Sequence, residues 1–170
     1  MRLAPDTQLT ARVVPLHAGA NGVAQTLRVM RALVRAYRVD PEIRSAATTA
    51  IFLTPERSTR HEVDALYTLV RDTVRYVRDV HEVETLQSPD KTIALRVGDC
   101  DDQAVLLASL LESVGYPTRF VAAGYAAPGE LDHVYLQVCL DGEWLDADPT
   151  ERMFLGWAPP DPVTLLVEHV

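Results

Sequence analysis

The chain has 170 residues, of which 48% are hydrophobic and 24% are charged, a balance typical of a globular protein rather than a disordered one. Its formal net charge of −8 argues against broad electrostatic binding to nucleic acid or to an anionic membrane surface. No apolar run approaches the length that spans a bilayer, and the first residues show no signal-peptide pattern. Two cysteines, Cys100 and Cys139, are too few for a disulfide scaffold. We therefore expect a cytoplasmic protein that binds neither nucleic acid nor membrane.

Helical patterns dominate the first 78 residues. Residues 8–16 have the character of a short edge strand, and a small-residue break at 18–22 precedes the first helix. Its apolar positions are Val23, Leu27, Met30, Val34 and Tyr37. Asp40-Pro41 starts a second helix that should run to about Phe52. The similar signal Thr54-Pro55-Glu56 starts a third, with apolar positions at Val63, Leu66, Val70, Val74 and Val77.

The second half of the chain predicts a loop, a buried helix and a sheet. Residues 79–98 lose periodicity and contain the turn signal Ser88-Pro89-Asp90, so we expect a long irregular loop beside the site. Residues 100–114 are apolar over a wide arc and predict a buried helix. Strands should follow at 118–123, 133–140 and 143–147, the last two joined by a two-residue turn. Helices first and an antiparallel sheet last indicate an α+β fold.

Cys100 stands where the predicted loop becomes the buried helix. A helix N-terminus offers unpaired backbone N–H groups and a positive dipole end, and both favour the nucleophilic thiolate. Asp99, Asp101 and Asp102 oppose the thiolate by their charge, unless they cap the helix and point to solvent. A lone cysteine is more often an inert core residue than a nucleophile, so Cys100 requires a base within reach.

The predicted hairpin supplies that base. With the turn at Asp141-Gly142, His133 and Asp148 become diagonal neighbours on one face, with Cβ atoms about 7–8 Å apart or less. The same face carries Trp144 and Asp146, while the opposite face is apolar. A polar sheet face is commonly just the solvated one, but a large indole there favours a site wall. Asp146 competes with Asp148 as the partner of His133.

Three motifs in register resemble the transglutaminase-like superfamily, which has a papain-like catalytic arrangement. They are Gly98-Asp99-Cys100-Asp101-Asp102, then His133 at a strand start, then Trp144-Leu145-Asp146-Ala147-Asp148-Pro149-Thr150. Tyr76-Val77-Arg78-Asp79 and Leu86-Gln87-Ser88-Pro89 also resemble bacterial and phage-borne relatives. The resemblance implies one α+β domain over residues 1–170. It would have a helical part at 1–66, a catalytic core at 67–150 and a C-terminal extension at 151–170.

The resemblance also implies a role for each motif. Cys100 would attack the carbonyl of a peptide or amide substrate and form a thioester, His133 would move the proton, and Asp148 would orient His133. The backbone N–H of Cys100 is the first candidate oxyanion donor, and Gln87 or Tyr76 is the second. Water as the acceptor would make the protein a peptidase or amidase, and an amine would make it a transglutaminase. No cofactor or metal is implied.

Two other classes of function stay open. A member of the fold that has lost catalysis would serve as a structural or assembly module, for example in a phage-related particle. The other is a cation site built from Asp99, Asp101, Asp102, His133 and Asp148, although their spacing resembles no known metal-binding loop.

Overall fold

The computed structural model describes residues 15–52, 54, 58–79 and 85–170. The helices in these ranges are α1 (Ala20–Tyr37), α2 (Pro41–Phe52), α3 (Thr59–Thr73), α4 (Pro89–Leu95) and α5 (Cys100–Ser113). The strands are β1 (Arg75–Tyr76), β2 (Val97–Gly98), β3 (Thr118–Gly124), β4 (His133–Leu140), β5 (Glu143–Ala147) and β6 (Thr164–His169). The last four strands form one antiparallel sheet in the order β5-β4-β3-β6. The fold is therefore α+β, as the sequence predicts.

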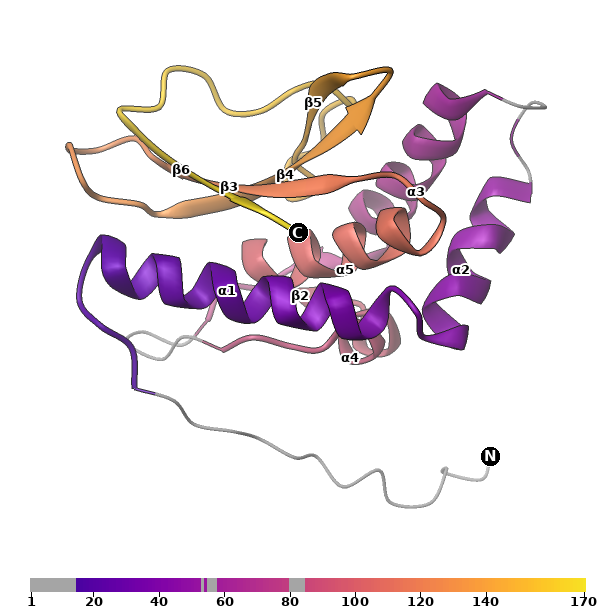
Figure 1. Cartoon of the computed structure of the whole chain (residues 1–170), viewed down its shortest axis with the longest axis horizontal. Helices are drawn as coiled ribbons and strands as arrows, with labels where there is room; N and C mark the ends of the chain where they lie inside the picture. Colours follow the sequence, from indigo (N-terminus) through magenta and orange to yellow (C-terminus); the bar gives the residue numbers. More distant parts are fainter. Residues whose placement is uncertain (1–14, 53, 55–57, 80–84) are drawn as a thin grey trace.

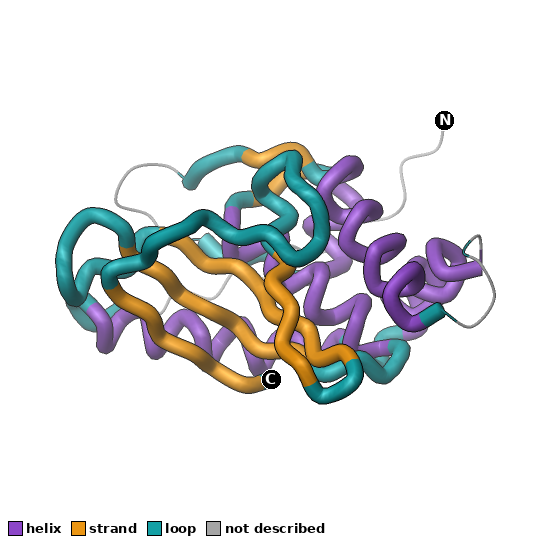
Figure 2. Tube along the Cα trace, turned by 90° about the horizontal axis from the view of Figure 1, so that it is seen from above, coloured by secondary structure: helices purple, strands orange, loops and turns teal. Residues whose placement is uncertain are grey.

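The helices lie against one face of the four-stranded sheet (Figure 1). Helix α5 is at the centre, packed against β3 and β4 and surrounded by the four other helices. The segment between β5 and β6 crosses the other face of the sheet (Figure 2). It is held there by hydrogen bonds from Val163 N to Gly124 O at 2.8 Å and from Tyr125 Oη to Pro159 O at 3.2 Å.

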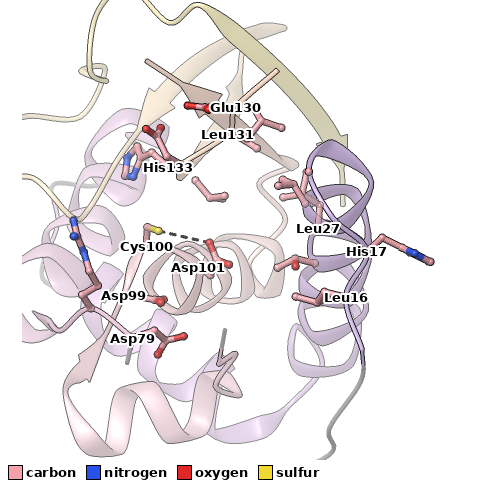
Figure 3. A pocket seen from close by; sticks show the side chains of 18 of the residues that line it. Leu16, His17, Leu27, Asp79, Asp99, Cys100, Asp101, Glu130, Leu131 and His133 are labelled. Atoms are coloured by element: carbon pink, nitrogen blue, oxygen red, sulfur yellow. Dashed lines mark hydrogen bonds between the residues drawn. The ribbon is translucent and has the colours of Figure 1, made fainter. Parts of the chain in front are cut away.

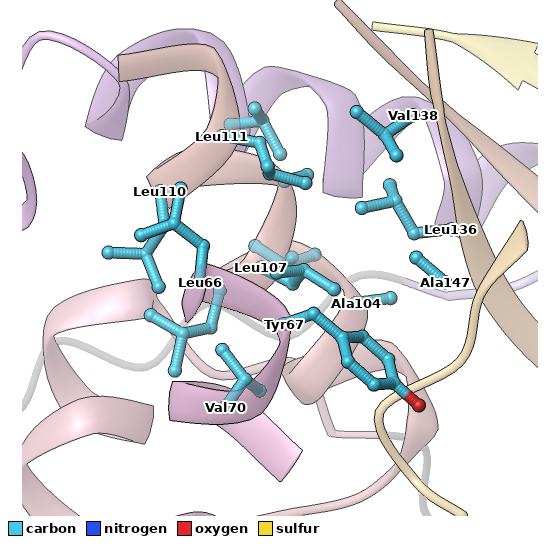
Figure 4. Close-up of a cluster of buried hydrophobic side chains, with 14 of the residues drawn as sticks. Leu66, Tyr67, Val70, Ala104, Leu107, Leu110, Leu111, Leu136, Val138 and Ala147 are labelled. Carbon is cyan, nitrogen blue, oxygen red and sulfur yellow. The ribbon is translucent and has the colours of Figure 1, made fainter. Parts of the chain in front are cut away.

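Helix α5 is buried on nearly all sides, as its wide apolar arc predicts. Residues 101–111 are all buried. Figure 4 shows side chains of α3, α5 and the sheet meeting in this core, with Leu107 near its middle. A helix enclosed in this way has little freedom to shift, so its first residue, Cys100, stands on a rigid support.

The N-terminal half differs from the prediction at the ends of helices. Helix α1 begins at Ala20, inside the predicted break. Helix α3 begins after Ser58, whose hydroxyl accepts from His61 N at 3.5 Å; of the predicted start signal Thr54-Pro55-Glu56, the last two residues lie outside the described residues. It ends at Thr73 because the following residues leave the helix to pair with β2. Of the predicted strand over 8–16, residues 8–14 lie outside the described residues, and 15–16 belong to no strand.

Two elements fall where the sequence predicts none. The irregular loop expected over 79–98 contains α4 and β2, because Ser88-Pro89 starts a helix instead of forming a turn. The expected C-terminal extension contributes β6, which pairs with β3 along the edge of the sheet. In β6, Leu165 and Val167 are exposed while Glu168 turns inward to Arg31 at 2.5 Å. Leu166 also packs against the core, so apolar side chains lie on both faces of β6 and no apolar-in, polar-out alternation reveals the strand.

Candidate active site

His133 and Asp148 meet at one end of the β4–β5 pair. The hairpin has the predicted register, from Leu140 opposite Glu143 to Leu136 opposite Ala147. His133 is the first residue of β4 and Asp148 follows β5, so the register brings the two side chains together. His133 Nε2 lies 2.7 Å from Asp148 Oδ2, and Asp148 is completely buried. The contact expected from the hairpin is therefore present.

A second set of hydrogen bonds fixes Asp148 from behind. Its other carboxylate oxygen, Oδ1, accepts from Thr150 N at 3.1 Å and from Thr150 Oγ1 at 2.6 Å. Tyr67 Oη donates to the carbonyl oxygens of Asp148 at 2.9 Å and Met153 at 3.2 Å. Burial raises the pKa of Tyr67 to about 12, so its hydroxyl stays a donor. Each carboxylate oxygen of Asp148 thus has its own hydrogen-bond partners, and only Oδ2 contacts His133.

Cys100 reaches the site as the first residue of α5. Strand β2 ends at Gly98, and a Cβ atom on Gly98 would lie 2.7 Å from Asp102 Cβ, so the chain passes too close for a larger residue. Asp99 then caps the helix, with Asp102 N donating to Asp99 Oδ1 at 3.3 Å and Asp99 N donating to Asp102 Oδ2 at 3.4 Å. This capping box sets the position of Cys100.

The surroundings of Cys100 favour a protonated thiol. Burial comes first and the charge of Asp101 second among the causes that raise its pKa, and Asp99 adds to them. The Cys100 thiol donates to Asp101 Oδ1 at 3.6 Å, while the backbone N–H of Val134 hydrogen-bonds to Cys100 and lowers the pKa in part. The acidic neighbours do not point to solvent as expected: Asp101 is 4% exposed and Asp102 is 1% exposed. The helix start alone does not activate this thiol.

Cys100 and His133 line the same cavity, which has a volume of about 830 Å³. Figure 3 shows the cavity, with Cys100 at the start of α5 and His133 across from it on β4. Tyr76 also lines the cavity, and burial, followed by the nearby Cys100, raises its pKa. The cavity extends from this point to the beginning of α1, so open space continues from the thiol along this helix end.

The core model of the transglutaminase-like superfamily matches residues 46–149, more than half of the chain. This chain belongs to the transglutaminase-like superfamily. No curated protein sequence matches it significantly. The superfamily motifs identified in the sequence all fall within or next to the matched range.

Several solved structures share this transglutaminase-like fold. A candidate cysteine protease from Cytophaga hutchinsonii is 17% identical, with a TM-score of 0.56 over 84% of this chain and 55% of its own. A candidate protease from Parabacteroides distasonis is 13% identical, with a TM-score of 0.58 over 85% of this chain and 28% of its own. Calcium-bound LapG from Legionella pneumophila is 22% identical, with a TM-score of 0.55 over 82% of this chain and 83% of its own. At these identities the likeness shows the fold, and this chain spans about half or less of the first two neighbours.

The structure does not bring Gln87 to the cavity as an oxyanion donor. Its backbone N–H and its side-chain Nε2 donate to the two carboxylate oxygens of Asp102, at 2.6 Å and 2.7 Å. Nε2 also lies 3.4 Å from Val97 O. Gln87 therefore ties the segment before α4 to the start of α5, because the buried carboxylate of Asp102 is the stronger acceptor within its reach.

Trp144 lies away from the cavity as well. It pairs with Cys139 near the turn of the hairpin, whereas His133 is at the other end of β4. Arg119 lies over its ring at 4.2 Å from the centroid, and His169 meets it edge-on at 5.4 Å. The indole is thus covered by its neighbours on the sheet, which explains its presence on this face without a substrate.

The remaining expectations concern Asp146 and metal ions. Asp146 Oδ1 accepts from Gln137 Nε2 at 2.7 Å, so the carboxylate that competes with Asp148 is turned to Gln137 instead of His133. Within the described ranges, no group of three or more His, Cys, Asp or Glu side chains is arranged to hold a metal ion. No helix in the described part of the chain is both long and apolar enough to cross a membrane.

Two residues that support the site carry no assignment in the sequence analysis. Tyr67 falls within the third predicted helix but is not among its apolar positions, and its hydroxyl contact with the Asp148 carbonyl joins residues 81 positions apart. Thr150 lies two residues after Asp148, a spacing at which a carboxylate commonly accepts from the following backbone and hydroxyl groups. That spacing was a usable signal for Thr150, whereas no local pattern marks Tyr67.

Proposed function

We propose that this protein is a cysteine-dependent acyltransferase that acts on a peptide or amide substrate through a thioester at Cys100. The observation that carries the proposal is the 2.7 Å contact between His133 Nε2 and the buried Asp148, with His133 lining the same cavity as Cys100. A buried carboxylate behind a histidine that faces a cysteine is the arrangement used in nucleophilic thiol catalysis.

In the proposed reaction, His133 accepts the proton of the Cys100 thiol while the sulfur attacks the substrate carbonyl carbon. The C–S bond forms, the carbonyl oxygen becomes an oxyanion, and His133 then returns the proton to the leaving amine as the C–N bond breaks. Water or a second amine attacks the resulting thioester, and His133 takes its proton. When the tetrahedral intermediate formed by this attack collapses, the C–S bond breaks and His133 returns the proton to the sulfur, which releases the acid or the new amide and restores the Cys100 thiol.

Asp148 and Thr150 have supporting roles in this scheme. With Nε2 of His133 bound to Asp148, Nδ1 is the ring nitrogen left to exchange a proton with Cys100. The buried carboxylate stabilises the imidazolium that forms, and Thr150 holds the carboxylate in place. The backbone N–H of Cys100 and the hydroxyl of Tyr76, kept protonated by its raised pKa, are the candidate oxyanion donors.

Mass spectrometry of peptide amides incubated with the protein tests this proposal. We expect hydrolysed product, or an amine adduct when a primary amine is added, from the unmodified chain and from Cys139→Ala. We expect neither from Cys100→Ala, although its circular dichroism spectrum should match that of the unmodified chain. Parallel arms with calcium and with a chelator are included because LapG was solved with calcium bound. Turnover that survives in Cys100→Ala would refute covalent catalysis at this residue.

A non-catalytic role of the fold is the second candidate, because the acidic and buried surroundings raise the pKa of Cys100. An acylating, thiol-directed probe separates the two candidates. Labelling of Cys100 in preference to Cys139 supports the enzyme. Equal labelling of the two cysteines, or none, supports a structural or binding module.

A further inference from the structure

The loop of residues 148–156, which follows β5, is closed at its neck. It begins at Asp148 and ends where Gly156 N donates to Asp146 O at 2.8 Å. Gly156 has a φ angle of 102°, a conformation that favours glycine, and this lets the chain turn back onto β5. Next to it, Leu155 is buried in the core, with 2% of its surface exposed. The loop is therefore fixed at the end that lies furthest along the chain from Asp148.

Helix α3 holds the rest of this loop through three side chains of one helical face. Arg60, Tyr67 and Arg71 are seven and four residues apart, a spacing that places them on the same side of a helix. Arg60 Nη2 donates to Leu155 O at 2.9 Å, and Arg71 Nη1 donates to Met153 O at 2.9 Å. These donors bind main-chain carbonyl groups, so α3 holds the backbone of the loop rather than its side chains.

Tyr67 makes the contact that reaches the candidate active site. Its hydroxyl donates to Asp148 O at 2.9 Å and to Met153 O at 3.2 Å, so one group joins the start of the loop to its middle. The side chain is completely buried, and Figure 4 shows its ring in the core with the hydroxyl directed out of the cluster. Arg71 lies over the ring, 5.5 Å from its centroid. A ring packed in this way has little freedom to turn, so it sets the position of the Asp148 peptide group.

The support behind Tyr67 is itself rigid. Val63, Leu66 and Val70 of α3 are fully buried in the core that surrounds α5. Neither Tyr67 nor the two arginines belong to the described residues that line the cavity beside Cys100. Any influence of α3 on the reaction must therefore pass through Asp148.

A small movement of the Asp148 main chain is enough to affect His133. The carboxylate is attached to the main chain through a single Cβ atom, so a shift of the peptide group carries Oδ2 with it. His133 Nε2 lies 2.7 Å from Oδ2, and a hydrogen bond weakens steeply once its distance and angle depart from the favoured range. The proton of a neutral imidazole is placed by the hydrogen bond that the ring makes, so a weaker contact releases the choice between the two nitrogens.

We infer that Tyr67 is a positioning residue for Asp148, which it holds through the loop 148–156 so that the proton of His133 stays on Nε2. The inference rests on the proposed acyl-transfer function and adds to it a residue that touches neither the substrate nor His133. Arg60 and Arg71 hold the same loop at carbonyl groups further along the chain from Asp148.

Tyr67→Phe tests the inference, because it removes the hydroxyl and keeps the ring in the core. We expect kcat to fall about ten- to hundredfold, the size of loss that follows from misplacing a group by about 1 Å, while KM is unchanged. The ring-nitrogen chemical shifts of His133, measured by NMR on the neutral ring and assigned with His133→Ala, report which nitrogen carries the proton. The unmodified chain should show the proton on Nε2, and Tyr67→Phe should show a mixture of the two tautomers.

Tyr116→Phe is the matched control, since it also removes a tyrosine hydroxyl that joins α3 to a distant part of the chain. Tyr116 follows α5, at the opposite end of this helix from Cys100, and its Oη donates to Glu62 Oε2 at 2.5 Å. The urea midpoint of unfolding should fall in both variants, because each loses a hydrogen bond. In Tyr116→Phe, however, kcat and the tautomer of His133 should match those of the unmodified chain.

The outcomes separate a positioning role from a structural one. Lower stability of Tyr67→Phe with the tautomer of His133 unchanged would overturn the inference, whether or not kcat falls, because the effect would then bypass His133. Equal losses of kcat in Tyr67→Phe and Tyr116→Phe would overturn it as well. The tautomer is measured without a substrate, so the inference is tested even if no peptide amide is turned over. A changed tautomer in Tyr67→Phe alone, with no turnover by the unmodified chain, would support the positioning role and count against the proposed function.

Discussion

The carboxylate that acts with His133 can be identified by replacing Asp148 and Asp146, one at a time, with asparagine. Asp148 Oδ1 accepts two hydrogen bonds from Thr150, so in Asp148→Asn the amide oxygen must take that place. The amide NH₂ group then faces His133 Nε2, where Asp148 Oδ2 accepted before. His133 must turn its proton to Nδ1, and this is the wrong tautomer for taking a proton from Cys100.

The geometry sets the size of the expected effects. Loss of the correct tautomer in a Ser–His–Asp site lowers kcat by about 10⁴-fold, and we expect a similar loss of turnover for Asp148→Asn. Stability should change little. Hydrogen bonds to a neutral acceptor are weaker by about 1 kcal/mol each than those to a carboxylate, while the completely buried site no longer holds a charge. The free energy of unfolding should therefore move by less than about 2 kcal/mol.

Turnover by mass spectrometry and unfolding in urea measure the two quantities on the same samples. Asp146→Asn is the control, because Asp146 binds Gln137 at 2.7 Å and faces away from His133. We expect the turnover of Asp146→Asn to stay within about threefold of that of the unmodified chain. Its side chain contacts no group that transfers a proton in the proposed reaction. If Asp148→Asn keeps turnover within tenfold, or Asp146→Asn loses as much, the assignment of Asp148 is refuted.

Three further substitutions test the core, the loop and the thiol. Leu107→Ala should lower the free energy of unfolding by about 2–5 kcal/mol in urea titrations, because Leu107 is fully buried in α5; a loss under about 1 kcal/mol would contradict this core. Gln87→Ala should cost about 1–3 kcal/mol by leaving the Asp102 carboxylate with fewer donors, with turnover per folded molecule unchanged; a 10²-fold loss of turnover at full stability would instead make Gln87 an oxyanion donor. Asp101→Asn should lower the pKa of the Cys100 thiol and speed its alkylation by iodoacetamide at neutral pH, about tenfold for each pKa unit; an unchanged rate would exclude Asp101 as a cause of the raised pKa.

The sequence predicts the hairpin and its site contact well because a local rule determines both. Asp141 and Gly142 have positive φ angles of 52° and 87°, as a two-residue type I′ turn requires. Once this turn is identified, the register of β4 and β5 follows, and with it the neighbouring positions of His133 and Asp148. The same parity placed Trp144 on the correct face. This parity does not tell at which end of a strand a residue lies, and the two ends of β4 are about 20 Å apart at 3.3 Å per residue.

Features that depend on contacts between residues far apart in the chain could not be predicted from the sequence. Helix α4 has seven residues, too few for a helical period to show, and β6 has apolar side chains on both of its faces. Gln87 turns to Asp102 because the capping box of α5 leaves that carboxylate buried and in need of donors. The hydroxyl of Tyr67 reaches Asp148 only after α3 has packed against the sheet. Each of these outcomes is decided by tertiary packing, which a single sequence does not display.

The acidic start of α5 explains why the proposed mechanism requires His133 as a base. A helix N-terminus ordinarily favours a thiolate, but here the capping box uses the backbone N–H groups of Asp99 and Asp102, and the charge of the two carboxylates offsets the dipole. Asp101 accepts the thiol proton in a hydrogen bond and favours the neutral form further. These surroundings favour the protonated form of the Cys100 thiol in the free protein. In the proposed mechanism, removal of its proton depends on the His133–Asp148 pair. A protonated thiol of this kind would react slowly with general alkylating agents, so its reactivity in the proposed mechanism comes from the base beside it rather than from the start of the helix.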